Sequence, residues 1–126
     1  MLDRRNVLKT LAAAPIFGSL AALQSWGNEY QAKENRRPRV AAIYTSFTYR
    51  SHAHVILENF LQPFLFCGEV TDPGVEVVSF YRDQTPAGDM TDAVAKEYGI
   101  PVFKTIRDAL CVGGTELAVD AVLSIG

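Results

Sequence analysis

The sequence predicts an α/β fold in the form of half a doubly wound sheet, with about four parallel strands and helices on both faces. Two observations lead to this prediction. Apolar runs of strand length alternate with helical segments from residue 39 to residue 126, which implies parallel strands joined by right-handed crossovers. The first strand, residues 40–45, is an almost continuous apolar run, as expected when helices cover both faces of a parallel sheet. The expected strand order is 3-2-1-4.

Three further strands are expected after the first. Each is a short run rich in β-branched or aromatic residues, and they cover residues 75–81, 100–103 and 120–125. After its first residue, Asp120, the last run is as apolar as an interior strand, whereas sheet edges are usually protected by charge or proline. It therefore indicates that the chain is truncated, the N-terminal part of a longer protein; a complete small domain is the alternative.

The first helix is expected after a polar loop at residues 46–51. Pro63 ends or kinks it near Gln62, because proline removes a helical hydrogen bond. Residues 68–74 then read as a turn-rich loop. The apolar stripe of this helix recurs at helical spacing and consists of Ala53, Ile56, Leu57, Phe60, Leu61 and Phe64.

Two shorter helices are marked by capping residues. Asp89 is expected to cap the second helix, which Gly99 ends in a left-handed conformation before Pro101. Thr105 and Asp108 have the spacing of a capping box and predict the start of the third helix.

The first 21 residues resemble an export signal. Arg4 and Arg5 precede an apolar run at residues 11–23, which is too short for the roughly 20 residues of a membrane anchor. Small residues near Ala21 suggest cleavage there, and the paired arginines indicate the twin-arginine export machinery as a partner. We expect a periplasmic or secreted protein without a stable membrane anchor, a linker at residues 22–38 and a domain at residues 39–126. The alternative is an amphipathic or buried N-terminal helix.

The charge of the chain and its two cysteines bear on which partners it can bind and on whether it contains a disulfide. The chain has 12 basic and 14 acidic side chains. Cleavage after Ala21 would remove three basic side chains and one acidic side chain, which leaves a net charge of −4. No basic patch with interleaved aromatic residues remains, which argues against a nucleic-acid partner. Cys67 and Cys111 both stand in apolar surroundings, which predicts unpaired, buried cysteines; a disulfide is the alternative in an oxidising compartment.

The strand and helix segments resemble the N-terminal Rossmann-like domain of the glucose–fructose oxidoreductase and inositol dehydrogenase family. The resemblance rests on residues 40–43, 75–78, 95–103, 105–110 and 119–125. It implies an oxidoreductase-like protein that binds NAD or NADP, and some members of that family are exported by the twin-arginine route. The catalytic lysine of the family lies beyond the fourth strand, so the resemblance assigns no catalytic residue to this chain.

The phosphate-binding loop departs from the family pattern. Tyr44, Ser46 and Tyr49 stand where the three glycines of the loop are expected, and two of those glycines allow the tight turn and the approach of the pyrophosphate. At the end of the second strand, where the family has an acidic residue for the ribose hydroxyls, this chain has Arg82 followed by Asp83. Arg82 would favour the 2′-phosphate of NADP; the alternative is a solvated Arg82–Asp83 pair.

The candidate cofactor-binding or ligand-binding residues surround the expected crevice at the carboxyl ends of the strands. They are Thr45, Ser46, Thr48, Arg50, His52 and Arg82. A metal site is not expected, because His52 and His54 diverge on a helix and no third ligand is evident. Two functions remain open: the nucleotide-binding head of an exported oxidoreductase, and a non-catalytic domain that has lost dinucleotide binding and takes another small molecule or a partner.

Overall fold

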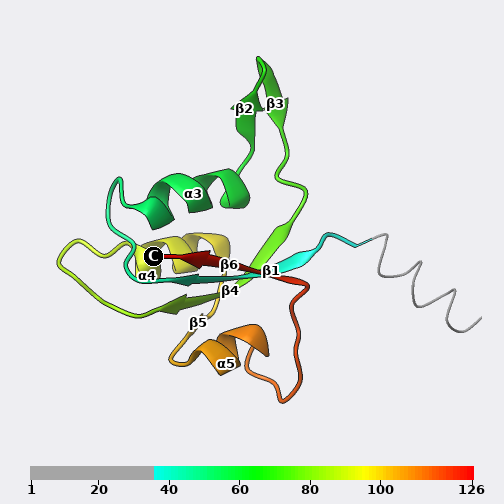
Figure 1. Ribbon diagram of the computed structural model, residues 1–126. Helices are drawn as coiled ribbons and strands as arrows, with labels where there is room; N and C mark the ends of the chain where they lie inside the picture. The colour runs from blue at the N-terminus through cyan, green and yellow to red at the C-terminus, as the bar shows by residue number, and fades with distance from the viewer. Residues whose placement is uncertain (1–35) are drawn as a thin grey trace, which may run out of the picture. The chain divides into compact units, whose positions relative to one another are not determined.

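The computed structural model describes residues 36–126, in which Arg37–Gly126 form one compact unit (Figure 1). The predicted signal at residues 1–21 lies outside the described residues, as does nearly all of the predicted linker at 22–38. Among the described residues, no helix has both the length and the apolar character that crossing a bilayer requires.

The fold is α/β, and its main sheet has four parallel strands in the predicted order. The order β5-β4-β1-β6 places the first strand of the chain in the interior. Each observed strand begins or ends within two residues of its predicted bounds. The strands are β1 (Arg39–Tyr44), β4 (Glu76–Arg82), β5 (Val102–Phe103) and β6 (Ala121–Ile125).

Helices cover both faces of this sheet, as the sequence predicts. The helices α3 (His52–Leu61) and α4 (Thr91–Tyr98) pack on one face, and the short helix α5 (Ile106–Leu110) packs on the other (Figure 1). The arrangement corresponds to a Rossmann-like half, since right-handed crossovers keep consecutive parallel units on one face until the strand order reverses.

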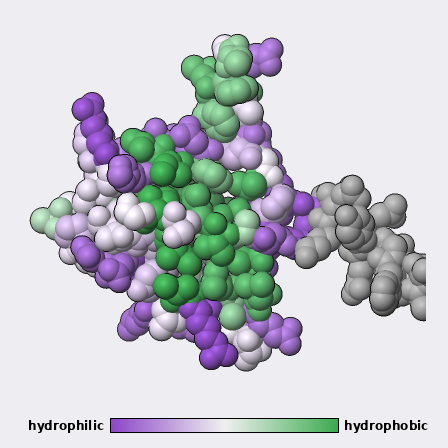
Figure 2. Space-filling model, in the orientation of Figure 1, coloured by the Kyte–Doolittle hydropathy of each residue, from purple (hydrophilic) through white to green (hydrophobic). Residues whose placement is uncertain are grey.

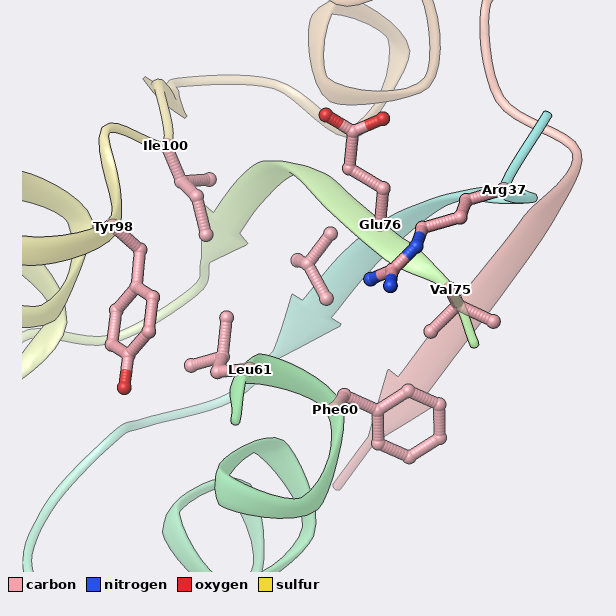
Figure 3. A pocket seen from close by; sticks show the side chains of 8 residues that line it. Arg37, Phe60, Leu61, Val75, Glu76, Tyr98 and Ile100 are labelled. Atoms are coloured by element: carbon pink, nitrogen blue, oxygen red, sulfur yellow. The ribbon is translucent and has the colours of Figure 1, made fainter. Parts of the chain in front are cut away.

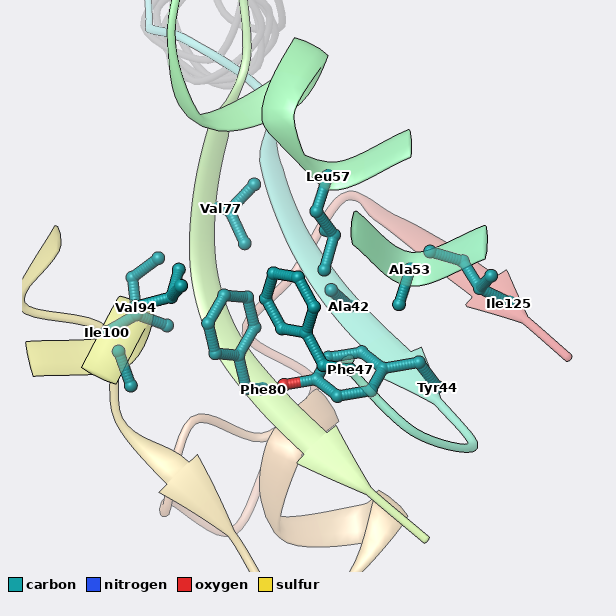
Figure 4. Packing of buried hydrophobic residues seen from close by; sticks show 11 residues of the cluster. Ala42, Tyr44, Phe47, Ala53, Leu57, Val77, Phe80, Val94, Ile100 and Ile125 are labelled. Carbon is teal, nitrogen blue, oxygen red and sulfur yellow. The ribbon is translucent and has the colours of Figure 1, made fainter. Parts of the chain in front are cut away.

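The larger part of the core lies between the sheet and the pair α3 and α4. Leu57 on α3 points toward Phe47, and Val94 on α4 lies beside Phe80 on β4 (Figure 4). The ring of Tyr44 meets the rings of Phe47 and Phe80 edge-on, each at 5.6 Å between centroids. Edge-on aromatic pairs add to the stabilisation from burial, so the last residue of β1 and the loop after it belong to the core.

The helix caps agree in part with the sequence. Gly99 adopts the left-handed conformation that ends α4, and the Thr105 hydroxyl caps α5 by accepting from the amide of Asp108, so both predictions are confirmed. The expected capping role of Asp89 is wrong in detail. Met90 occupies the N-cap position without a side-chain bond, while Asp89, one residue earlier, accepts from the Thr91 amide at 3.0 Å.

A β-hairpin replaces the loop predicted at residues 68–74. Strands β2 (Phe64–Phe66) and β3 (Glu69–Thr71) pair antiparallel and project from the domain beyond α3 (Figure 1). Cys67 and Gly68 form the two-residue turn with φ of 52° and 85°, the positive values that a type I′ turn requires. The sequence does not predict this turn, because cysteine occupies the first turn position, where asparagine is usual.

The cysteine prediction is half right. Cys67 and Cys111 are free, as predicted, but Cys67 is exposed at the hairpin turn and Cys111 is only half-buried. The apolar neighbours of Cys67 made burial plausible, yet Leu65 and Phe66 are themselves exposed.

Candidate functional site

Two cavities of similar size lie at opposite ends of the sheet. The first, of about 320 Å³, opens at the amino ends of the strands between the ends of α3 and α4 (Figure 3). Its walls combine apolar and polar groups: Phe60 and Leu61 lie opposite Ile100, and Arg37 at its rim is held by Asp72 at 3.0 Å. None of the residues predicted for the site lines this cavity.

The second cavity, the carboxyl-end crevice, has a volume of about 310 Å³. It lies where β1 and β6 end and α3 begins, which is the point at which the strand order reverses. Ligands of open α/β sheets bind at such switch points. The crevice contains four of the six predicted residues, Thr45, Ser46, Arg50 and His52, and is completed by Ser51, Ala53 and Gly126.

A third hollow of about 240 Å³ adjoins the crevice and shares Thr45 and Gly126 with it. Its other walls come from the ends of β4 and β6 and from α5, and they include Tyr81, Asp83 and Ile106. The two hollows therefore lie on either side of the end of β1, and a ligand larger than one hollow has a neighbouring space to occupy.

The loop before α3 satisfies most of its own amide groups. In a phosphate-binding loop these amides are the donors that face the ligand, but here they donate to side chains and carbonyls of the protein. The bonds are Phe47 N to Asp89 Oδ2 at 3.3 Å, Thr48 N to Ser51 Oγ at 3.2 Å, Arg50 N to His54 Nδ1 at 2.8 Å, Ser51 N to Thr48 O at 3.0 Å and His54 N to Ser51 Oγ at 3.3 Å.

Arg50 stands in the left-handed region, with φ of 62°. A residue other than glycine adopts this conformation at a cost, which the bond from the Arg50 amide to His54 helps to offset. The Arg50 guanidinium lies over the ring of Tyr49, 5.2 Å from its centroid, and the Tyr49 ring in turn meets that of His54 at 5.4 Å. The contacts hold a cation at the mouth of the crevice.

His52 lies at the first position of α3, and its ring reaches across the crevice to Gly126, which follows β6. Its Nδ1 is 3.3 Å from the carbonyl oxygen of Gly126. A carbonyl only accepts, so this contact is a hydrogen bond when Nδ1 carries the proton. That tautomer leaves Nε2 as an acceptor. The His52 side chain is exposed.

The residues in the glycine positions do not all block the crevice. Tyr44 turns into the core, where its hydroxyl donates to Thr91 Oγ1 at 3.2 Å and burial raises its pKa well above the usual range. Tyr49 lies on the surface with 67% of its area exposed. The side chain that fills the inner side of the loop is Phe47, which is 2% exposed. Phe47 is not among the residues predicted for the site, although it is the one phenylalanine in the polar loop.

Arg82 is engaged away from the crevice. Its guanidinium contacts Asp89 at 3.0 Å and Asp92 at 3.1 Å. Burial raises the pKa of Asp89, but hydrogen bonds from the Thr91 side chain and from the amides of Phe47 and Thr91, together with Arg82, outweigh it and hold that pKa below its usual range. Asp89 thus joins β4, α4 and the loop before α3. Arg82 therefore pairs with Asp92 on α4 and with Asp89 just before that helix. The alternative of an Arg82–Asp83 pair is not among its ion pairs.

Thr48 also lies outside the residues that line the crevice, because it packs in the turn that precedes α3 and its amide is bound to Ser51. Within residues 36–126, no group of three or more histidine, cysteine, aspartate or glutamate side chains is placed to hold a metal ion.

Comparisons with protein-family models, with curated proteins and with solved structures found no match to this chain.

Proposed function

We propose that the domain binds a small anionic molecule in the carboxyl-end crevice and that it does not hold a dinucleotide pyrophosphate as Rossmann-like oxidoreductases do. One observation carries the proposal: a cavity of about 310 Å³ gathers Thr45, Ser46, Arg50 and His52 at the switch point of the sheet. Its volume lies at the lower end of the range for small-molecule sites, roughly 300–1,000 Å³.

The chemistry of the crevice favours an anionic group on the ligand. Arg50 supplies the positive charge, and Ser46 and Thr45 supply hydroxyl donors. The amides of His52 and Ala53 open the first turn of α3, where helical amides have no acceptor within the helix and the helix dipole is positive. A single phosphate or carboxylate group fits this set of donors.

A pyrophosphate in the family's position is disfavoured by the loop itself. The amides that would bind it are occupied by Asp89, Ser51, Thr48 and His54. Releasing them costs hydrogen bonds worth about 1 kcal/mol each, and Phe47 would have to leave the core. We therefore assign the domain to ligand binding rather than to redox chemistry.

Titration followed by NMR tests this proposal, with inorganic phosphate, AMP and NADH as probes. We expect millimolar binding of phosphate and AMP, no more than tenfold tighter binding of NADH, and at least tenfold weaker binding of all three to Arg50→Ala. Lys96→Ala, which removes an exposed cation on α4, is the matched control and should bind as the parent does. Equal affinities for the two variants, or no shifts at 10 mM phosphate or AMP, would count against the site.

The second candidate is the nucleotide-binding head of an exported oxidoreductase with its catalytic part elsewhere. The strand order β5-β4-β1-β6 favours it, together with the family resemblance of the sequence. In the same titration, NADH or NADPH binding more than a hundredfold tighter than AMP would favour this candidate, because only a dinucleotide mode uses both halves of the cofactor.

We also propose export by the twin-arginine route into the periplasm or medium, a proposal that rests on Arg4, Arg5 and the apolar run that follows them. A bacterial cell expressing the whole chain should release it from the cytoplasm only when its twin-arginine translocase is intact. Replacing both arginines by lysine should retain it. Export that is unaffected by either change would refute this route.

A further inference from the structure

The amino-end cavity, the one that opens at the amino ends of the strands, has the size of a small-molecule site. Its volume of about 320 Å³ is close to that of the carboxyl-end crevice and falls within the range of roughly 300–1,000 Å³ for ligand pockets. Since a water molecule takes up roughly 30 Å³, a ligand of about ten non-hydrogen atoms fits. None of the described residues that line this cavity lines the crevice, so a site here is independent of the proposed function.

The ends of two helices supply the apolar walls of the amino-end cavity. Phe60 and Leu61 come from the last turn of α3, and Tyr98 and Ile100 come from the end of α4 and the residues after it. Val77 on β4 lies between the two helix ends. Phe60 and Leu61 are only half-buried, and Tyr98 is 39% exposed. The apolar body of a ligand would cover this surface and remove it from water, which is favourable.

Arg37 is the one cation among the described residues that line the cavity. Figure 3 shows its side chain reaching toward the cavity, whereas the Glu76 carboxylate points away from α3. The alternation of side chains along a strand explains this difference, because Val75 and Val77 on either side of Glu76 face α3. A ligand in the cavity therefore meets a positive charge.

Hydrogen bonds of the neighbouring segments position Arg37. The Glu76 amide donates to the Pro38 carbonyl at 2.9 Å, which continues the pairing of β1 and β4 next to Arg37. Asp72 Oδ2 accepts from Arg37 Nη2 at 3.0 Å, while its Oδ1 accepts from the Gly74 amide at 2.8 Å. Because a guanidinium carries five N–H donors, it can bind a second carboxylate beside Asp72.

We propose that the amino-end cavity binds a small carboxylic acid with an apolar body. The carboxylate accepts hydrogen bonds from Arg37, and the apolar body lies between Phe60 and Leu61 on one side and Ile100 on the other. Arg37 and Asp72 together carry no net charge, so short-range contacts hold the acid and its affinity is millimolar. A neutral molecule forgoes the charge-assisted hydrogen bonds, which are roughly twice as strong as neutral ones.

NMR titration of the 126-residue chain tests the proposal, with phenylacetate as the probe and phenylacetamide as its neutral counterpart. We expect phenylacetate to shift the amide signals of Leu61, Val77 and Ile100 with a millimolar dissociation constant, and phenylacetamide to bind at least tenfold more weakly. Equal affinities for the acid and the amide, shifts confined to residues 45–53 of the crevice, or no shifts at 10 mM phenylacetate would overturn the proposal.

The role of Arg37 is tested by removing its charge. Arg37→Gln should weaken phenylacetate binding at least tenfold. The fold should tolerate this change, because the side chains of Arg37 and Asp72 are both exposed and exposed ion pairs contribute little to stability. Arg107→Gln removes an exposed cation from α5, on the other face of the sheet, and should bind as the parent does. Equal affinities of the two variants would contradict the proposal.

A variant that fills the cavity tests its location independently of charge. Val75 lies at the cavity wall near Phe60 (Figure 3), so Val75→Phe should abolish phenylacetate binding. Val70→Phe is the control and should bind as the parent does, because Val70 is 76% exposed on the hairpin, which projects from the domain with apolar side chains on its surface (Figure 2). Circular dichroism establishes that both variants are folded. A folded Val75→Phe variant that binds as tightly as Val70→Phe overturns the proposal.

Discussion

The two segments that flank α3 both carry large apolar side chains, but only one of them buries these side chains. In the loop before the helix, Phe47 is 2% exposed; in the hairpin after it, Leu65 is 74% and Phe66 is 64% exposed. Their compositions do not explain the contrast, since the loop is the more polar of the two in sequence.

The difference lies in how each segment is bonded to the rest of the domain. The loop exchanges bonds with distant segments: Gln84 N donates to Thr45 O at 2.7 Å and Met90 N donates to Phe47 O at 2.6 Å. Within residues 36–126 the hairpin strands pair only with each other, and near the base of the hairpin an exposed Arg37–Asp72 ion pair connects it to the residues just before β1. Backbone bonds to distant segments, rather than apolar content, decide which segment joins the core.

The largest expected effect comes from truncating the buried ring. Phe47→Ala should lower the free energy of unfolding by about 3–4 kcal/mol, because it leaves a cavity beside Tyr44 and Leu57. Phe66→Ala should change it by less than about 0.5 kcal/mol, as at other exposed positions. Denaturant unfolding of both variants measures the contrast, and similar losses in the two would show that the hairpin is part of the cooperative unit.

Asp89 is the next test, because its carboxylate joins the loop to β4 and α4. Asp89→Asn should cost about 1–3 kcal/mol at pH 7 through lost charge-assisted hydrogen bonds to Phe47, Thr91 and Arg82. The lowered pKa of Asp89 means that its contribution is fully present above the unfolded pKa of about 3.9 and is lost as the pH falls through the lower folded value.

The pH profile provides the control for Asp89. Unfolding free energies measured between pH 7 and pH 2 should converge for the parent and Asp89→Asn at the acid end. A difference that stays constant over this range would mean that the ionised carboxylate is not the stabilising species. The variant Asp92→Asn, whose carboxylate is largely exposed, should show a smaller difference throughout.

The smallest effect is expected at the hairpin turn. Cys67→Asn should favour the type I′ turn, because asparagine adopts positive φ more readily than cysteine. We expect slower hydrogen exchange at the paired amides of the hairpin, by less than tenfold, without a change in the global melting temperature. A higher melting temperature would instead show that the hairpin unfolds together with the sheet.

The sequence predicted the sheet well because its signals there are local and mutually consistent. The apolar run of β1, the left-handed Gly99 and the Thr105 cap each determine one element without help from distant residues. The hairpin escaped prediction because Cys67 replaces the usual turn residue. The exposure of Leu65 and Phe66 could not be predicted, because burial depends on packing partners that lie outside the local sequence.

The sequence predicted where the site residues lie in the fold, but it did not predict which groups their side chains contact. Thr45, Ser46, Arg50 and His52 line the crevice because the topology of parallel sheets brings the end of β1 and the start of α3 to the switch point. Arg82 was assigned to the same site from its place at the end of β4, yet Asp89 and Asp92, several residues later, determine where its guanidinium lies. The inward turn of Phe47 likewise depends on Asp89, 42 residues away.

The central position of β1 has a consequence for synthesis. β1 is the first strand of the domain, and its two neighbours are the strand that begins at Glu76 and the strand that begins at Ala121. While the ribosome adds residues 83–120, one edge of β1 has no partner, and contacts between segments so distant in sequence form slowly. Chaperones that bind nascent apolar segments should therefore recognise β1 until β6 has emerged.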